Sequence, residues 1–182
     1  MTREELEHAI RAACSVSEDD ELWVFGSQAI LGQHPDAPGS LRQSVEVDVA
    51  PKNREERVDV IDGALGELSA FHSTYGFYVH CVPIESVILS QGWVDRAIPV
   101  SGKGARPSTG WCVECHDLAA SKLVADREKD RRFVRTLIVE QLVRADVLID
   151  RVRSLPIDQT KCDRLTKWIN AIAGSNSQGM SG

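Results

Sequence analysis

The chain has 182 residues, of which 42% are hydrophobic and 26% are charged, and its formal net charge is −6 at pH 7. These values are typical of a soluble globular protein that can bury a sizeable core. The negative charge disfavours a protein that coats nucleic acid, although a local basic patch can still hold a nucleic-acid end. No apolar run approaches the roughly 20 residues that span a bilayer, and the N-terminus lacks a signal peptide's apolar stretch. We therefore expect a cytoplasmic protein that binds no membrane.

The spacing of Thr2 and Glu5 is that of a capping box and predicts a helix over residues 2–14. A first strand is expected at 22–25, followed by the Gly26-Ser27 turn and a short helix that starts between Ser27 and Leu31. The later segments are predicted as strands at 44–50, 76–82 and 94–100, a helix at 53–70, a loop at 102–110, and helices at 116–126, 128–153 with a break, and 158–173.

These elements predict an α+β fold, in which a mixed sheet with flanking helices is followed by a helical part. Residues 1–115 are expected to form the core, and residues 116–173 a C-terminal helical region packed on it. Residues 174–182 are rich in Gly, Ser and Asn, which predicts a disordered tail.

The segment Ser44-Val45-Glu46-Val47-Asp48-Val49 alternates polar and apolar residues. This period of two places both carboxylates on one face of a strand and the valines on the other. Paired carboxylates suit Mg²⁺, which prefers oxygen ligands and often shares its shell with substrate phosphates. The Gly26-Ser27 turn can offer backbone N–H groups and a hydroxyl to the same phosphates. Together they predict the core of a nucleotidyltransferase that uses an NTP, whereas an E-x-D pair alone is also typical of a solvated edge strand.

Several motifs follow one another in a fixed order: residues 25–31, 35–38, 44–48, 92–96, 116–123 and 127–130. Over residues 22–135 they resemble nucleotidyltransferase-fold proteins of the DUF6036 and AbiEii type, a group that resembles bacterial toxins such as the mycobacterial MenT toxins. The resemblance implies a minimal polymerase-β-like fold and a cognate antitoxin protein as partner. It also implies nucleotide transfer to an acceptor hydroxyl, with the tRNA 3′ end favoured over a protein hydroxyl, which would block translation.

By this resemblance Glu46 and Asp48 hold the metal and act in catalysis, while Gly26 and Ser27 contact the triphosphate. Ser44 matches a position that some relatives have phosphorylated to silence the toxin.

The same resemblance places Lys122 and Lys129 at the nucleotide and gives Lys122 and Asp130 a catalytic role. Around them, the arginines at 131, 132 and 135 could meet an RNA backbone. They could equally form a solvated helix face with ion pairs four residues apart.

Two features depart from the commonest family pattern. Glu46 stands where many nucleotidyltransferases have Asp, and no third carboxylate is evident on the third strand, where His80 falls. His34, His72 and His80 show no partner pattern and are expected to be structural or surface residues. The alternative function is therefore a catalytically weak binding module that acts through a partner protein.

The segment Cys112-Val113-Glu114-Cys115-His116 has the spacing of a c-type haem attachment motif. We expect no haem, because such attachment belongs to an oxidising compartment and the chain shows no export signal. Structural, reduced thiols are favoured, with a redox pair or a zinc site as alternatives.

Overall fold

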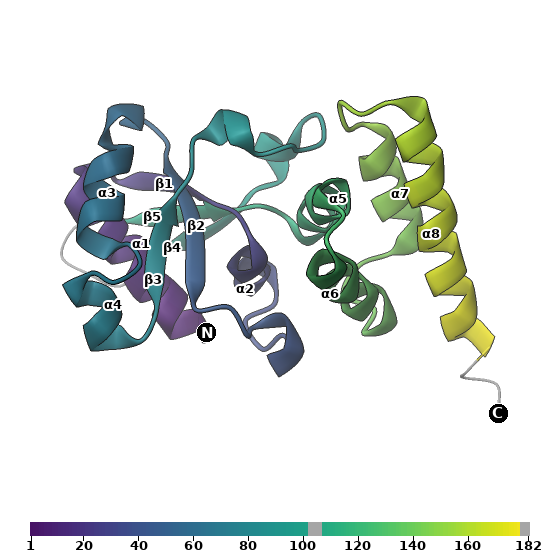
Figure 1. Cartoon of the computed structure of the whole chain (residues 1–182), viewed down its shortest axis with the longest axis horizontal. Helices are drawn as coiled ribbons and strands as arrows, with labels where there is room; N and C mark the ends of the chain where they lie inside the picture. Colours follow the sequence, from purple (N-terminus) through teal and green to yellow (C-terminus); the bar gives the residue numbers. More distant parts are fainter. Residues whose placement is uncertain (102–106, 179–182) are drawn as a thin grey trace. The chain divides into compact units, whose positions relative to one another are not determined.

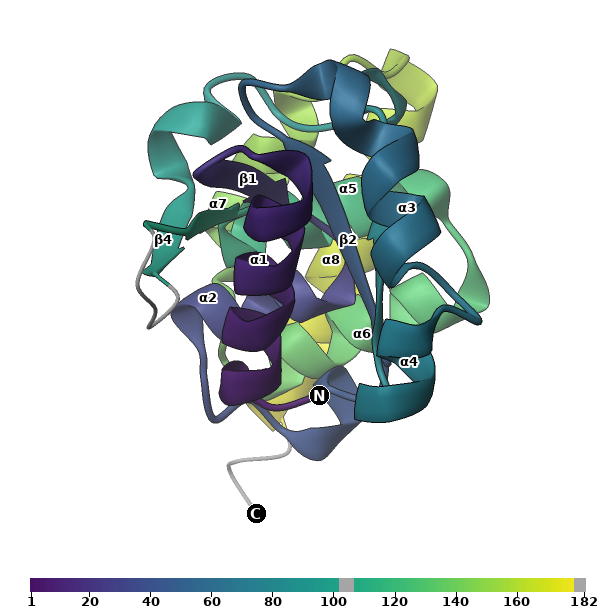
Figure 2. The ribbon, with the colours of Figure 1, turned by 90° about the vertical axis from the view of Figure 1, so that its left-hand side faces the viewer.

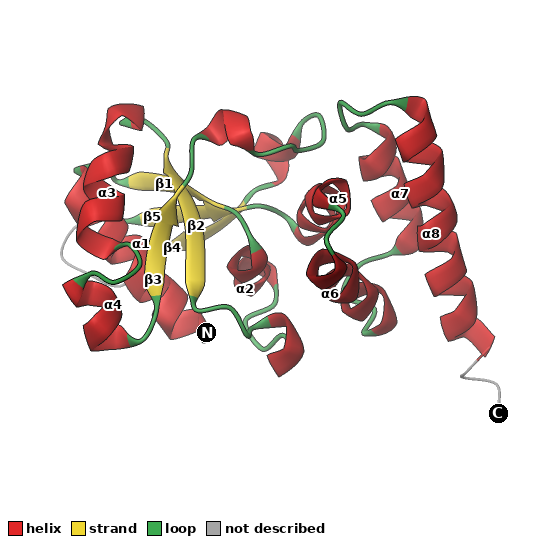
Figure 3. Ribbon diagram, viewed as in Figure 1, coloured by secondary structure: helices red, strands yellow, loops and turns green. Residues whose placement is uncertain are grey.

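The computed structural model describes residues 1–101 and 107–178. They form two compact units (Figure 1; Figure 3 shows the secondary structure). The first consists of residues 1–87 and 94–114, and the second of residues 88–93 together with the chain from 115 onward.

The first unit is built around a mixed five-stranded sheet with the order β3-β2-β1-β5-β4. β1 pairs antiparallel with β2 and parallel with β5, β2 pairs parallel with β3, and β4 pairs antiparallel with β5. The mixed sheet with flanking helices confirms the predicted α+β class. The strands are β1 (Glu21–Val24), β2 (Glu46–Pro51), β3 (Tyr78–Cys81), β4 (Ile98–Ser101) and β5 (Thr109–Cys112).

Helices cover one face of this sheet. α1 (Arg3–Ser17) begins at the predicted capping box, in which Thr2 accepts from Glu5 N and the Glu5 side chain accepts from Thr2 N. α1 packs beside α3 (Val58–Leu65), and both lie over the sheet in Figure 2. The core between them contains fully buried side chains from helices and strands, among them Leu6, Ile10, Ile61, Val47, Val49 and Val79.

Three sequence predictions for this unit need correction. The helix expected over 53–70 is divided into α3 and α4 (Ala70–Tyr75), since the helix ends at Gly66 and Leu68 has a φ of 66°. The strand expected at 94–100 is only partly present, because Trp93–Arg96 form a 3-10 helix and β4 begins at Ile98. The short helix expected after Ser27 is confirmed, as a 3-10 turn over Ser27–Ala29 that continues into the single-turn α2 (Ile30–Gln33). β5 lies partly in the segment expected to be a loop, whose residues 102–106 are outside the described residues.

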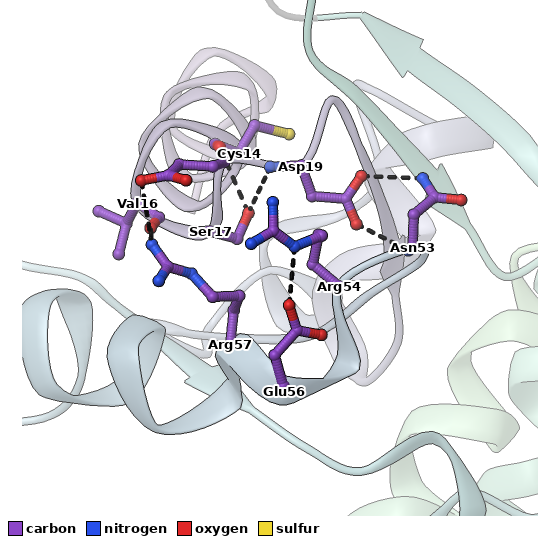
Figure 4. Close-up of polar contacts among 9 residues, drawn as sticks. Cys14, Val16, Ser17, Asp19, Asn53, Arg54, Glu56 and Arg57 are labelled. Atoms are coloured by element: carbon purple, nitrogen blue, oxygen red, sulfur yellow. Dashed lines mark hydrogen bonds and ion pairs between the residues drawn. The ribbon is translucent and has the colours of Figure 1, made fainter.

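The register between β1 and β2 is held at one end by a polar cluster around Asp19 (Figure 4). The Asp19 carboxylate is 4% exposed and accepts hydrogen bonds from Asn53 N at 2.7 Å, Asn53 Nδ2 at 2.9 Å and Glu21 N at 3.1 Å. Asp19 N in turn donates to Ser17 Oγ at the end of α1. The cluster therefore ties the start of β1 to the chain that leaves β2, and so sets which residues of the two strands face each other.

The second unit is helical, with α5 (Cys115–Ala125), α6 (Glu128–Val139), α7 (Ala145–Arg153) and α8 (Gln159–Gln178). α5 packs against α6 and α7, and α7 against α8. The break expected within 128–153 is present between α6 and α7. α8 continues through 174–178, where the sequence indicated a disordered tail, and residues 179–182 lie outside the described residues. Within the described ranges, no helix is long and apolar enough to cross a bilayer.

Candidate active site

The predicted carboxylate pair lies on the polar face of β2. Val47 and Val49 are fully buried on the opposite face, while the side chains of Glu46 and Asp48 are 36% and 27% exposed. The strand therefore presents both acids to one side, as the alternation in the sequence predicts.

Asp48 lies directly against the Gly26 backbone. Gly26 has φ 61° and ψ −167°, a conformation almost restricted to glycine. A Cβ at this position would lie 1.8 Å from Asp48 Oδ2, so only a residue without a side chain fits. Phe25 N also donates to Asp48 O at 2.8 Å, which fixes the end of β1 beside β2. The glycine turn and the carboxylates thus meet at one place in the first unit.

The residues after the turn reach the start of β2. Gln28 is fully buried, and its Nε2 donates to Ser44 O at 3.0 Å. The Ser44 hydroxyl accepts from Glu46 N at 3.2 Å and is half-buried. Ser27 begins the 3-10 turn that carries Gln28. The segment from Ser27 to Gln28 therefore holds the backbone immediately before the first carboxylate.

His80 joins the two carboxylates, although the sequence indicated no partner for it. Its Nδ1 lies 3.0 Å from Glu46 Oε1 and 3.2 Å from Asp48 Oδ1, because the parallel register sets Asp48 opposite His80. The sequence feature that could have placed His80 on the same face as the carboxylates is the alternation on β3, in which Val79 and Cys81 are buried and His80 is exposed on the other face.

The carboxylates determine the titration of this histidine. Burial alone would lower the pKa of His80, but the hydrogen bond and charge of Asp48, followed by the charge of Glu46, raise it above its ordinary value. The side chains of Glu46 and Asp48 thus form a region of negative potential beside the Gly26 turn.

This group of side chains fits a divalent cation. Glu46, Asp48 and His80 each offer one ligand atom, and these atoms all lie within 4.8 Å of one another. Two carboxylate oxygens are the donors that Mg²⁺ and Mn²⁺ accept. The close approach of Gly26 adds a backbone surface beside the same oxygens, where a phosphate could lie.

The remaining predicted residues belong to the second unit. Lys122 Nζ lies 3.3 Å from Asp130 Oδ1, and Arg127 Nε lies 2.6 Å from Asp130 Oδ2. Asp130 is 1% exposed, whereas the adjacent Lys129 is exposed. Burial would raise the pKa of Asp130, but the Arg127 hydrogen bond and the charge of Lys122 lower it below its usual range. Lys122 and Asp130 are thus brought together, Lys129 points to solvent, and their roles toward a nucleotide stay predictions.

Two of the neighbouring arginines form ion pairs along the helical region. Arg131 pairs with Asp126 at 2.5 Å, and Arg132 pairs with Glu128 at 3.3 Å. The Arg132–Glu128 pair has the spacing of four residues that the alternative of an ion-paired helix face expects, whereas Arg131 and Asp126 are five residues apart.

All five cysteines are free and buried. Burial, opposed by the charge of Arg3, raises the pKa of Cys112 to about 12. Such a thiol is a poor nucleophile at neutral pH, which favours a structural role for Cys112 over a redox role. Glu114, Cys115 and His116 offer ligand atoms that lie within 4.8 Å of one another, so the alternative of a metal site at this segment stays a prediction.

One family profile, described as "Nucleotidyltransferase of unknown function (DUF6036)", matches residues 4–170. The chain belongs to this family. No curated protein and no solved structure matches the chain. Membership in DUF6036 supports the nucleotidyltransferase class, and with it an NTP substrate, in broad terms. The narrower resemblance to MenT-like toxins is supported by no named relative and stays a prediction.

Proposed function

We propose that this DUF6036 protein is a Mg²⁺-dependent nucleotidyltransferase that moves a nucleoside monophosphate from an NTP to an acceptor hydroxyl. The favoured acceptor is the 3′ end of tRNA, so that the protein would act as a toxin that blocks translation and is neutralised by an antitoxin protein. One observation carries the proposal: the Asp48 carboxylate lies against the Gly26 turn, with Glu46 on the same face of β2.

In this mechanism Glu46 and Asp48 hold the cation, and the turn positions the triphosphate. A cation held there supplies charge neutralisation and lowers the pKa of the attacking hydroxyl. The acceptor oxygen forms a bond to the α-phosphorus, the bond from that phosphorus to the bridging β-oxygen breaks, and pyrophosphate leaves while the hydroxyl proton passes to solvent. Because Gly26 has no side chain, Asp48 Oδ2 can lie directly against the turn, so a cation held by Asp48 would lie beside the backbone proposed to bind the phosphates.

Lys122 and Lys129 are proposed to meet the phosphates as point charges, with Asp130 orienting Lys122 through their 3.3 Å ion pair. Ser44 is proposed as a regulatory site. A phosphate on its hydroxyl, which now accepts from Glu46 N, would add about two negative charges beside the metal ligands. The expected effect is weaker binding of both cation and nucleotide.

The test is transfer of label from each α-labelled NTP to total tRNA in the presence of Mg²⁺. We expect label on tRNA with the wild-type protein and a loss of at least about a hundredfold in Asp48→Ala, since a metal ligand is removed. Asp59→Asn, which changes an exposed acid on α3, is the matched control and should retain full activity. Ser44→Glu and Lys122→Ala should each reduce transfer in the same assay.

Label on protein instead of tRNA would support the nucleotidyl-transfer reaction but identify a protein hydroxyl as the acceptor. No transfer to either acceptor, with any NTP, would reject the enzyme and favour the alternative of a binding module that acts through a partner protein. The toxin role is tested separately, by growth arrest on expression of the wild-type chain compared with Asp48→Ala.

A further inference from the structure

We propose that His80 is the third ligand of the cation held by Glu46 and Asp48, and that this site therefore prefers a first-row transition-metal dication such as Mn²⁺ to Mg²⁺. The inference deepens the proposed function, because it concerns the same site and changes the metal that occupies it.

The positions of the donor atoms support direct coordination by all three side chains. In an octahedral shell with bonds of about 2.1 Å, neighbouring ligand atoms lie about 3.0 Å apart. His80 Nδ1 lies 3.0 Å from Glu46 Oε1 and 3.2 Å from Asp48 Oδ1. The imidazole nitrogen thus already has the spacing of a ligand next to both carboxylates. Coordination by Nδ1 requires the neutral imidazole, so cation binding displaces the proton that Nδ1 shares with the carboxylates, and this proton passes to solvent.

The backbone fixes this arrangement. Asp48 and His80 are register partners in the parallel pair β2–β3, so their side chains leave the same face of neighbouring strands. Val79 and Cys81 are buried on the opposite face, which prevents the strand from turning His80 away. Tyr78 is the register partner of Glu46 and is hydrogen-bonded to it, which limits the positions that Glu46 can take.

The chemistry of the donor set decides the preferred metal. Mg²⁺ is a hard cation that takes oxygen ligands almost exclusively, and an imidazole adds little to its binding. First-row transition-metal dications accept imidazole together with carboxylates, and Mn²⁺ retains the octahedral geometry that suits phosphate substrates. Exchanging the third oxygen ligand for nitrogen therefore shifts selectivity away from Mg²⁺.

The decisive variant is His80→Asp, which supplies a third carboxylate on the same strand position. Full-length wild-type and variant proteins are titrated with Mn²⁺ alone, bound metal is followed by electron paramagnetic resonance, and Mg²⁺ is then used as competitor. We expect the ratio of Mn²⁺ to Mg²⁺ affinity to fall at least about tenfold in His80→Asp. The spin-echo modulation from a directly bound nitrogen should be present in the wild type and lost in the variant.

His34→Asn is the control, because it removes another histidine of the first unit, at the C-terminal end of α2, and it should leave the affinity ratio unchanged. Circular dichroism and thermal unfolding establish that His80→Asp is folded. Absence of the nitrogen modulation in wild-type protein, an unchanged ratio in His80→Asp, or no Mn²⁺ binding at all would each overturn the inference. Since no nucleotide or acceptor is present, these readouts are independent of transfer: an enzyme active with Mg²⁺ but without nitrogen coordination would reject this inference and leave the proposed function standing.

Discussion

Gly26 is the residue on which the geometry of the site depends most directly. Its backbone conformation is almost restricted to glycine, and the space that a Cβ would occupy is filled by Asp48 Oδ2. Any side chain at this position must displace the metal ligand or change the turn, and either change separates the carboxylates from the backbone that would hold the phosphates.

We therefore expect Gly26→Ala to abolish Mn²⁺ and Mg²⁺ binding and to lower the free energy of unfolding by about 1–3 kcal/mol, the range for such backbone strain. Urea denaturation and metal titration measure the two effects. Gly63→Ala is the matched control, because nothing lies within 4 Å of the added Cβ and the residue is within α3. It should be neutral or stabilising by up to about 1 kcal/mol. A Gly26→Ala protein that binds metal like the wild type would contradict the role assigned to the turn.

At the scale of elements, the pairing of β1 with β2 determines that Gly26 meets Asp48. A slip of one residue would move both carboxylates to the buried face of the sheet. Asp19 opposes such a slip from the other end of the pair, where it binds Asn53 and Glu21. The stability of this cluster is thus linked to the geometry of a site at the opposite end of the strands.

Asp19 should make the stability of the protein depend on pH. Burial would raise the pKa of its carboxyl, but hydrogen bonds from the Asn53 side chain and backbone and from Glu21 N lower it below its ordinary value. A lowered folded-state pKa means that the stabilisation is complete above the unfolded value of about 3.9 and is lost as pH falls through the folded-state pKa. Asp19→Asn should therefore be less stable than wild type at pH 7, and the difference should shrink toward pH 3.

The measurement is urea denaturation of both proteins between pH 7 and pH 3. Asp20→Asn alters the exposed neighbouring acid and should follow the wild-type pH profile. If the difference in unfolding free energy between wild type and Asp19→Asn stayed constant over this range, the charge of the Asp19 carboxylate would not account for the stabilisation.

Elements that are determined by neighbouring residues could be predicted from the sequence, whereas elements that depend on pairing with distant residues could not. α1 and the two faces of β2 could be predicted, because a capping box and a period of two act within a few residues of the chain. β5 could not, since Thr109–Cys112 contains a glycine and becomes a strand only by pairing with β1 and β4. At Gly110 the side chain of Ile10 from α1 fills the space that a Cβ would need.

The candidate site likewise combines residues placed by a local pattern with a residue placed by strand pairing. Glu46 and Asp48 follow from the alternation on one strand, while the approach of His80 depends on a parallel register between residues 32 positions apart. No pattern within either strand predicts the register between β2 and β3. The break between α3 and α4 was missed for a related reason, because the positive φ of Leu68 contradicts the apolar periodicity that runs through it.

At the scale of the whole molecule, the two units are not consecutive in sequence. The second unit takes residues 88–93 from between two segments of the first. Within the second unit, Ser90 and Asp117 are fully buried and the Ser90 hydroxyl donates to the Asp117 carboxylate. Gln91 N donates to Ser154 O after α7. The segment 88–93 is thus a structural part of a helical unit from which it is distant along the chain.

This topology predicts that a change in residues 88–93 will loosen helices far along the sequence. Ser90→Ala removes the hydroxyl donor from a buried carboxylate, which still has Arg151 Nε 3.4 Å away, and should cost about 1–3 kcal/mol of unfolding free energy. Hydrogen exchange should accelerate first in α5 and α7, because Asp117 and Arg151 lie on these helices. Ser86→Ala is the control, since the exposed Ser86 hydroxyl donates only locally, to Pro83 O, within the first unit. If Ser90→Ala instead accelerated exchange only in residues that flank position 90, the segment would be a surface connection and not a structural part of the helical unit.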